Sequence, residues 1–244
     1  MSERFPQLFW GMIALAAGLV VGSALTAGAV KNMRRGDEQI EVTGSARRPI
    51  RSDVAIWRLS VTAQGTTLQQ ASAGVDGPTQ RVLTFLRQNA VPDSVLTIGA
   101  LSPEPLFRIL ENGQATSEVV AYRVTQHFEL RSTDVAGIKA LERRAAALIR
   151  EGVPLNSQPP EYLYTKLAEV RTQMLADATE DARRRADAIA RSAGSEIGAV
   201  RNARMGVFQI TPRNSTEVSD YGINDTSSLD KDITAVVRVT FSVD

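Results

Sequence analysis

The feature that most constrains this fold is a set of segments in which apolar and polar residues alternate. In one of them Trp57 and Leu59 are separated by polar or charged residues, so that the apolar side chains fall on one side. Because successive side chains of a β-strand point to opposite faces, this alternation predicts half-buried strands. The alternating segments are Gln39–Gly44, Asp53–Gly65, Ser117–Ser132 and Asp232–Val243.

Further extended segments are expected around 95–101, 105–110, 155–164 and 199–210. Asn112-Gly113 lies between the second of these and the strand 117–132, and this dipeptide favours a tight hairpin turn. In the strand 117–132 we expect one apolar face. Its members are Val120, Tyr122, Val124, Phe128 and Leu130.

Other segments have apolar residues at steps of three and four, which is typical of helices packed on one face. They run over Thr67–Asn89, where Gly77-Pro78 predicts a kink, over Asp134–Arg150, and over Lys166–Ser192, which Gly194 ends. Strands joined by hairpins and separated by such helices predict the α+β class. The simplest arrangement is one mostly antiparallel sheet with the helices packed on one face.

The N-terminus carries an uncharged apolar run from Leu8 to Val30. A helix of about 20 apolar residues crosses a bilayer, whereas the apolar part of a secretory signal has roughly 7–15. The length favours one transmembrane helix, although Ala27-Gly28-Ala29 would also suit a cleavage site. We therefore divide the chain into a membrane anchor or signal segment, residues 1–36, and an α+β domain, residues 37–244.

Basic residues follow this run, and they bear on its orientation. Read literally, the positive-inside rule leaves the large domain in the cytoplasm, but long domains cross largely regardless of flanking charge. Both orientations therefore stay open from the charges alone. The basic residues are Lys31, Arg34, Arg35, Arg47, Arg48 and Arg51.

Three consecutive arginines, Arg183 to Arg185, raise the question of a nucleic-acid or lipid site. Acids precede them by one helical turn, and the expected pairs are Glu180–Arg184, Asp181–Arg185 and Asp187–Arg191. The whole chain has 28 Lys and Arg against 27 Asp and Glu, without the basic excess of nucleic-acid binders. We therefore interpret the arginines as a solvated helix face and expect no nucleic-acid partner. The apolar stripe beneath them is predicted to contain Leu167, Val170, Met174, Ala178, Ala182, Ala186, Ile189 and Ala193.

Residues for catalysis are scarce. The chain has no cysteine and a single histidine, His127, which lies on the polar face of its strand and is interpreted as a surface residue. The sequence contains no nucleophile elbow, P-loop or dinucleotide motif. We assign no catalytic, cofactor-binding or metal-ligating residue and expect a protein that is not an enzyme. A carboxylate-only metal-dependent hydrolase is the least favoured alternative.

One long polar segment, Thr211–Lys231, separates the last two strands. Long loops without secondary structure are usually functional or mobile. The alternative function is therefore a binding module for a small ligand or lipid, with this loop as its lid.

The order of these parts resembles the SIMPL-domain family, which includes the bacterial periplasmic immunogenic proteins. The similarity rests on the opening segment around Gly44, Asp53, Thr67 and Ala71 and on Tyr122 in the central strand. It rests also on an alanine-rich helix with a fixed pattern. That pattern is occupied by Ala178, Asp181, Ala182, Ala186, Ile189, Ala190, Gly194, Ile197 and Gly198.

Over roughly residues 38–244, this resemblance implies an α+β fold, export to the bacterial envelope, self-association into rings, and a loose link to oxidative or envelope stress. It implies no catalytic residues. Together with the apolar run 8–30, it leads us to expect an inner-membrane protein whose large domain faces the periplasm. We expect a non-enzymatic, self-assembling structural or interaction module, a homo-oligomer whose protein partner the sequence does not identify.

Overall fold

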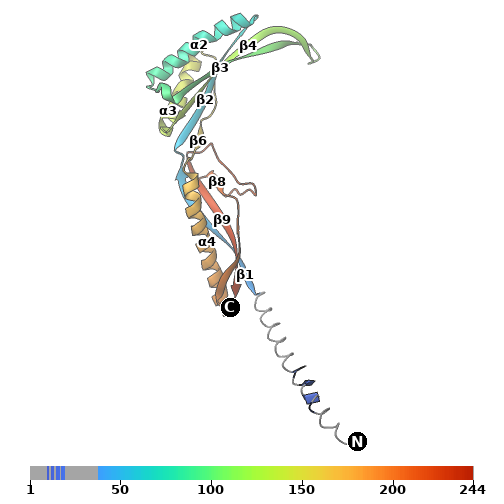
Figure 1. Ribbon diagram of the computed structural model, residues 1–244. Helices are drawn as coiled ribbons and strands as arrows, with labels where there is room; N and C mark the ends of the chain where they lie inside the picture. The colour runs from blue at the N-terminus through green and yellow to red at the C-terminus, as the bar shows by residue number, and fades with distance from the viewer. Residues whose placement is uncertain (1–9, 11, 14, 17, 20–37, 244) are drawn as a thin grey trace. The chain divides into compact units, whose positions relative to one another are not determined.

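The computed structural model describes residues 10, 12–13, 15–16, 18–19 and 38–243 (Figure 1). The predicted anchor, residues 8–30, lies outside this part of the chain except for those first few positions. Among the described residues, none of the helices combines the length and the apolar character that a membrane crossing requires.

The described residues 38–243 contain three α-helices and two sheets, which confirms the α+β class. The elements are β1 (Gln39–Arg51), β2 (Val54–Gly65), α2 (Leu68–Gln88), the 3-10 helix η1 (Asp93–Val95), β3 (Leu96–Ile109), β4 (Ala115–Ser132), α3 (Val135–Arg150), β5 (Leu155–Ser157), β6 (Glu161–Leu163), α4 (Leu167–Ser192), β7 (Ile197–Met205), β8 (Gln209–Pro212) and β9 (Asp230–Val243).

The expectation of a single sheet is wrong. One sheet has the order β1-β9-β7 with β8 beside β9, and the other has the order β3-β4-β2-β5 with β6 beside β2. The chain accordingly divides into two compact units. Unit 1 is Met1–Arg47, Arg171–Phe208 and Thr234–Asp244, and unit 2 is Arg48–Val170 and Gln209–Ile233. Alternation identifies strands but not their pairing partners, so it did not reveal this division.

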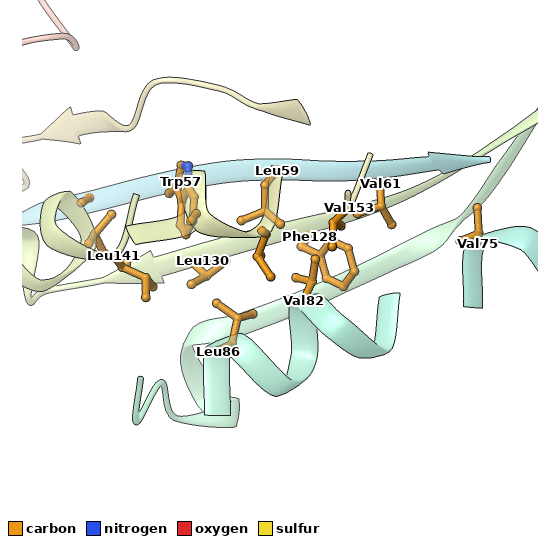
Figure 2. Close-up of a cluster of buried hydrophobic side chains, with 14 of the residues drawn as sticks. Trp57, Leu59, Val61, Val75, Val82, Leu86, Phe128, Leu130, Leu141 and Val153 are labelled. Carbon is orange, nitrogen blue, oxygen red and sulfur yellow. The ribbon is translucent and has the colours of Figure 1, made fainter. Parts of the chain in front are cut away.

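Unit 2 contains the larger core. Helices α2 and α3 pack on the face of the sheet that carries Trp57, Leu59 and Phe128 (Figure 2). Helix α2 begins at an N-cap residue, Thr67, whose hydroxyl accepts a hydrogen bond from the Gln70 amide at 3.2 Å. The fully buried residues of this core include Trp57, Val61, Val75, Val82, Leu86, Val124, Phe128 and Leu130.

Gly77-Pro78 does not end the helix, because α2 is one helix from Leu68 to Gln88 with Pro78 inside it. Proline removes one intrahelical hydrogen bond. Val75 and Val82, on either side of it, are each only 1% exposed. We infer that their packing on the sheet holds both halves of the helix in place.

Unit 1 contains a very close approach between strand β1 and helix α4. Gly44 faces the helix, where a Cβ would overlap the backbone of Ala178 and Ala182 and lie 2.7 Å from the Ala182 Cβ. The Ser45 amide then donates a hydrogen bond to the Asp181 carboxylate at 2.9 Å. The small residues of this stripe therefore let the strand and the helix backbone meet.

The arginines of α4 pair as predicted. Glu180 and Asp181 both contact Arg184 at 3.3 Å, Asp181 contacts Arg185 at 2.8 Å, and Asp187 contacts Arg191 at 2.9 Å. The predicted stripe is wrong at its end, since Ile189 is 51% exposed and Ala193 is exposed as well, while Ala190 is buried. The buried positions continue at steps of four from Ala178 to Ala190, so Ala190 rather than Ile189 lies on the buried face.

Candidate functional site

The residues on which the resemblance to the SIMPL-domain family rests have structural roles. The Asp53 carboxylate accepts hydrogen bonds from the Thr165 amide and from its hydroxyl, both at 2.8 Å, just before α4 begins. Gly194 has a φ of 78° at the end of α4, a left-handed conformation that favours glycine. Tyr122 packs against the core of unit 2. None of these positions forms a reactive cluster.

A hairpin formed by β3 and β4 is the largest exposed apolar feature of unit 2. The two strands pair antiparallel from Leu96–Leu130 to Ile109–Ala115, and the predicted turn at Asn112-Gly113 joins them, with Gly113 at a φ of 82°. In Figure 1 the hairpin, drawn in green, reaches past the end of α2. We call its outer part, residues 99–121, the arm.

The arm exposes apolar side chains that no other described element covers. Phe107 and Val119 are cross-strand neighbours, 44% and 40% exposed, and Ile109 is 70% exposed. These three side chains share one face of the arm, because Phe107 pairs with Val119 and Ile109 with Ala115. They present roughly 300 Å² of apolar surface, within the range of the largest patch on a typical monomer. Leu101 and Val120 are exposed on the opposite face, and Leu110 is exposed at the turn. Val120 was predicted to face inward with Tyr122, but it is 43% exposed because its strand has passed beyond the helices.

The edge of the arm is unsuited to adding another strand. β3 is the outer strand of its sheet, and it carries Pro103 and Pro105 opposite Val124 and Tyr122. A proline has no amide to donate, and edge prolines discourage pairing with a further strand. The arm therefore offers side chains rather than backbone groups for contact.

The charges of the arm are few and mostly paired. Arg108 contacts Glu118 at 2.7 Å, and Arg123, just beyond the arm, contacts Glu104 at 3.2 Å. Glu111 is the remaining charged residue between positions 99 and 123. The arm and Arg123 thus hold one more carboxylate than guanidinium, so they produce no strong field of either sign.

The single histidine lines a hollow of about 410 Å³ on the sheet of unit 2. His127 is exposed, as expected. Because side chains alternate, it lies on the face opposite to Phe128 and the helices. Ser60, Thr97, Asn156 and Gln158 also line this hollow. Sequence reasoning did not bring these residues together, since they come from four separate segments.

An ion-pair triad borders the hollow. The Arg58 guanidinium contacts Glu129 and Glu161, each at 2.8 Å. The hydrogen bond that Arg58 donates to Glu129, helped by the charge of Glu161 and opposed by burial, raises the pKa of Arg58 above its ordinary value. Among the residues that the structure describes, no group of three or more His, Asp or Glu is placed to bind a metal ion.

A buried lysine anchors the long loop after β8 by hydrogen bonds. Lys231 is 2% exposed, and its ammonium donates hydrogen bonds to the Tyr162 carbonyl oxygen at 2.6 Å and to that of Asp225. Burial lowers the pKa of Lys231, while the Asp225 carboxylate opposes that shift. Nothing between Thr211 and Lys231 lines the hollow at His127, so in the described structure the loop is not a lid for it.

Comparison with known proteins gives one informative match. A family model described as "SIMPL: Protein of unknown function (DUF541)" matches residues 40–241. Among solved structures, a putative aminohydrolase from methicillin resistant Staphylococcus aureus is 19% identical, with a TM-score of 0.26, over 57% of this chain and 39% of that chain. That likeness is too low to carry an argument, and no curated protein matches. The family model covers most of the chain, and the protein therefore belongs to the SIMPL family.

Proposed function

We propose that this protein is a self-assembling, non-enzymatic interaction module of the bacterial cell envelope, and that copies of the chain associate through the arm. The observation that carries the proposal is the exposed apolar surface around Phe107, Ile109 and Val119. Burying roughly 300 Å² of apolar surface on each partner contributes a favourable free energy, at about 25 cal/mol per Å² before the costs of association.

The charge of the arm favours a second copy of the chain over a membrane surface or a nucleic acid. Anionic lipids and nucleic acids attract basic surfaces. The arm, in contrast, carries Glu104 and Glu118 already paired with arginines, and Glu111 in addition. Two such arms approach without strong repulsion, and their apolar side chains then supply the attraction.

The placement in the envelope is part of the same proposal. The uncharged run 8–30 has the length of a membrane-spanning helix, and the family resemblance implies export, possible ring assembly and a link to envelope stress. We place the anchor in the inner membrane with residues 38–244 in the periplasm. A topology reporter fused after Asp244 tests this placement, and a cytoplasmic signal would contradict it.

The assembly proposal is tested on the full-length chain in detergent by size-exclusion chromatography with light scattering. The double variant Phe107→Thr, Val119→Thr removes apolar area from the arm, and threonine is a β-branched residue that suits strands. We expect the wild type to have the mass of an oligomer and the variant to dissociate at least tenfold more readily, because exposed aromatic side chains at interface centres dominate binding.

The control is Val218→Thr, Tyr221→Thr, which changes a pair on the long loop that is even more exposed than Phe107 and Val119. This control retains the mass of the wild type. A monomeric wild type, or an arm variant of unchanged mass with an intact circular dichroism spectrum, refutes assembly through the arm. Hydrolase activity that survives purification, with or without divalent metal, refutes the non-enzymatic part.

A further inference from the structure

The hollow at His127 is built from two rows of side chains that cross the sheet. In the first row, Ser60 of β2 lies between Asn156 of β5 and His127 of β4. In the second, Glu129 lies between Arg58 and Thr97. Because neighbouring strands are about 4.8 Å apart, the first row places hydroxyl, carboxamide and imidazole groups within reach of one small molecule.

A β-bulge opens the hollow beside His127. Ile98 pairs with Phe128 and Leu101 pairs with Gln126, so two residues of β3 lie opposite the single His127. One of these is Gly99, whose missing side chain leaves the space beside the imidazole empty. A Cβ there would lie 3.5 Å from the His127 Cβ, an ordinary contact.

The bulge is fixed from the other side of the sheet. The Gln126 side chain, only 7% exposed, donates hydrogen bonds to the carbonyl oxygens of Gly99 at 2.6 Å and His127 at 3.1 Å. Bulges are over-represented beside functional sites, where they redirect a side chain. The hollow is therefore a formed feature rather than a fluctuation of an edge strand.

The lining determines which ligands suit it. Arg58, the only Lys or Arg among the lining residues, is paired with Glu129 of the same lining and with Glu161, so its guanidinium is not available to bind an anion. The other polar side chains include the uncharged Ser60, Asn156 and Gln158, each of which offers both donors and acceptors. Neutral molecules with many hydroxyl groups match such a surface.

We propose that the hollow at His127 binds a neutral, hydroxyl-rich ligand of the size of a sugar with one or two rings. Its volume of about 410 Å³ falls within the range of small-ligand sites. The proposal goes beyond assembly through the arm, because of the arm residues only Gly99, at its base, lines the hollow, and a scaffold needs no ligand. Since the hollow is open to solvent, the binding is weak and rapidly reversible.

The single histidine is a built-in reporter for this binding. The full-length chain has one imidazole, so its ring C–H signals in an NMR spectrum are assigned without ambiguity. We expect N-acetylglucosamine to shift them in a saturable manner, whereas cationic glucosamine and anionic glucuronate shift them less at equal concentration. The titrations are made at one fixed pH, so that protonation of the ring does not contribute.

Two variants and one control make the test specific. Gly99→Leu fills the hollow at a position that accepts a Cβ and weakens binding at least tenfold, and Asn156→Ala removes one hydrogen-bonding group and weakens it about fivefold. Thr125→Leu places the same side chain on β4, on the face that carries His127 but outside the lining residues, and leaves the affinity within twofold.

Three outcomes overturn the proposal. They are the absence of a saturable shift with the neutral sugar, equal affinity of the wild type and Gly99→Leu, and tighter binding of either charged sugar. None of them bears on assembly, which is read from the mass of the particle.

Discussion

Replacing Gly44 by alanine tests the close approach of β1 to α4. The added Cβ would lie 2.7 Å from the Ala182 Cβ and would overlap backbone atoms of Ala178 and Ala182. Carbon atoms pack at about 3.5–4.0 Å, so the strand and the helix must separate by about 1 Å. The clashing backbone atoms belong to a helix and have no rotamer through which to move away.

The cost follows from this separation. A gap of up to about 1 Å forfeits a quarter to a half of each dispersion contact across it, and Ala178, Ala182 and Ala186 on this seam are all 0% exposed. Overpacking typically costs about 1–3 kcal/mol, and we expect Gly44→Ala to lie near the upper limit. For a chain of this size, a loss of about 3 kcal/mol lowers the melting temperature by roughly 6–12 °C.

The matched control is Gly77→Ala in the middle of α2, where a Cβ meets nothing within 4 Å. Alanine is the better helix former by about 0.5–1 kcal/mol, so this variant melts slightly higher than the wild type. Both melting temperatures are followed by circular dichroism at 222 nm on the full-length chain. A Gly44→Ala variant that melts within about 2 °C of the wild type would refute the reasoning.

Two further predictions concern a carboxylate and a lysine. The hydrogen bond from the Ser45 amide, with the charges of Arg184 and Arg185 and against the effect of burial, lowers the pKa of Asp181. Its stabilisation is therefore present above the ordinary carboxyl pKa, near 4, and is lost as the pH falls below it. The melting temperature of Asp181→Asn should be lower than that of the wild type at pH 7 and should fall less than that of the wild type between pH 5 and pH 3. A difference in melting temperature that is the same at every pH would contradict this. Lys231→Met leaves the Tyr162 and Asp225 carbonyl oxygens without their ammonium donor. Hydrogen exchange should then be at least tenfold faster at the Asp225 and Tyr162 amides, which bond to Ile210 and Thr226, and unchanged in α3. Unaltered exchange at those two amides would show that Lys231 does not hold the loop.

Much of the local structure was predictable because burial follows periodicity. In α3, the apolar residues that recur at steps of three and four are buried: Val135, Ile138, Leu141, Ala145 and Leu148. The Asn112-Gly113 turn and the acid–arginine pairs of α4 were predicted for the same kind of reason, since the residues that determine them are close together in the chain.

What sequence reasoning missed depends on contacts between distant segments. Val120 belongs to an alternating face, but periodicity does not reveal whether a helix covers that part of the strand. Lys231 has the sequence context of a solvated loop residue, although it is buried against the Tyr162 carbonyl oxygen. The bulge opposite His127 leaves no local signal beyond a single glycine, so the hollow could not be predicted.

The strand order of unit 1 has a consequence for how the protein is made. In the order β1-β9-β7, the middle strand comes later in the chain than both of its neighbours. During synthesis or export, β1 and β7 both emerge before the strand that joins them, while most of unit 2, from Arg48 to Val170, is already complete. Domains tend to fold from the N-terminal side as the chain emerges, but here β1 can pair only after the fourteen residues of β9 have been made. A chain that stops before Asp230 lacks the central strand of that sheet, so truncated products have two unpaired strands for a protease to recognise.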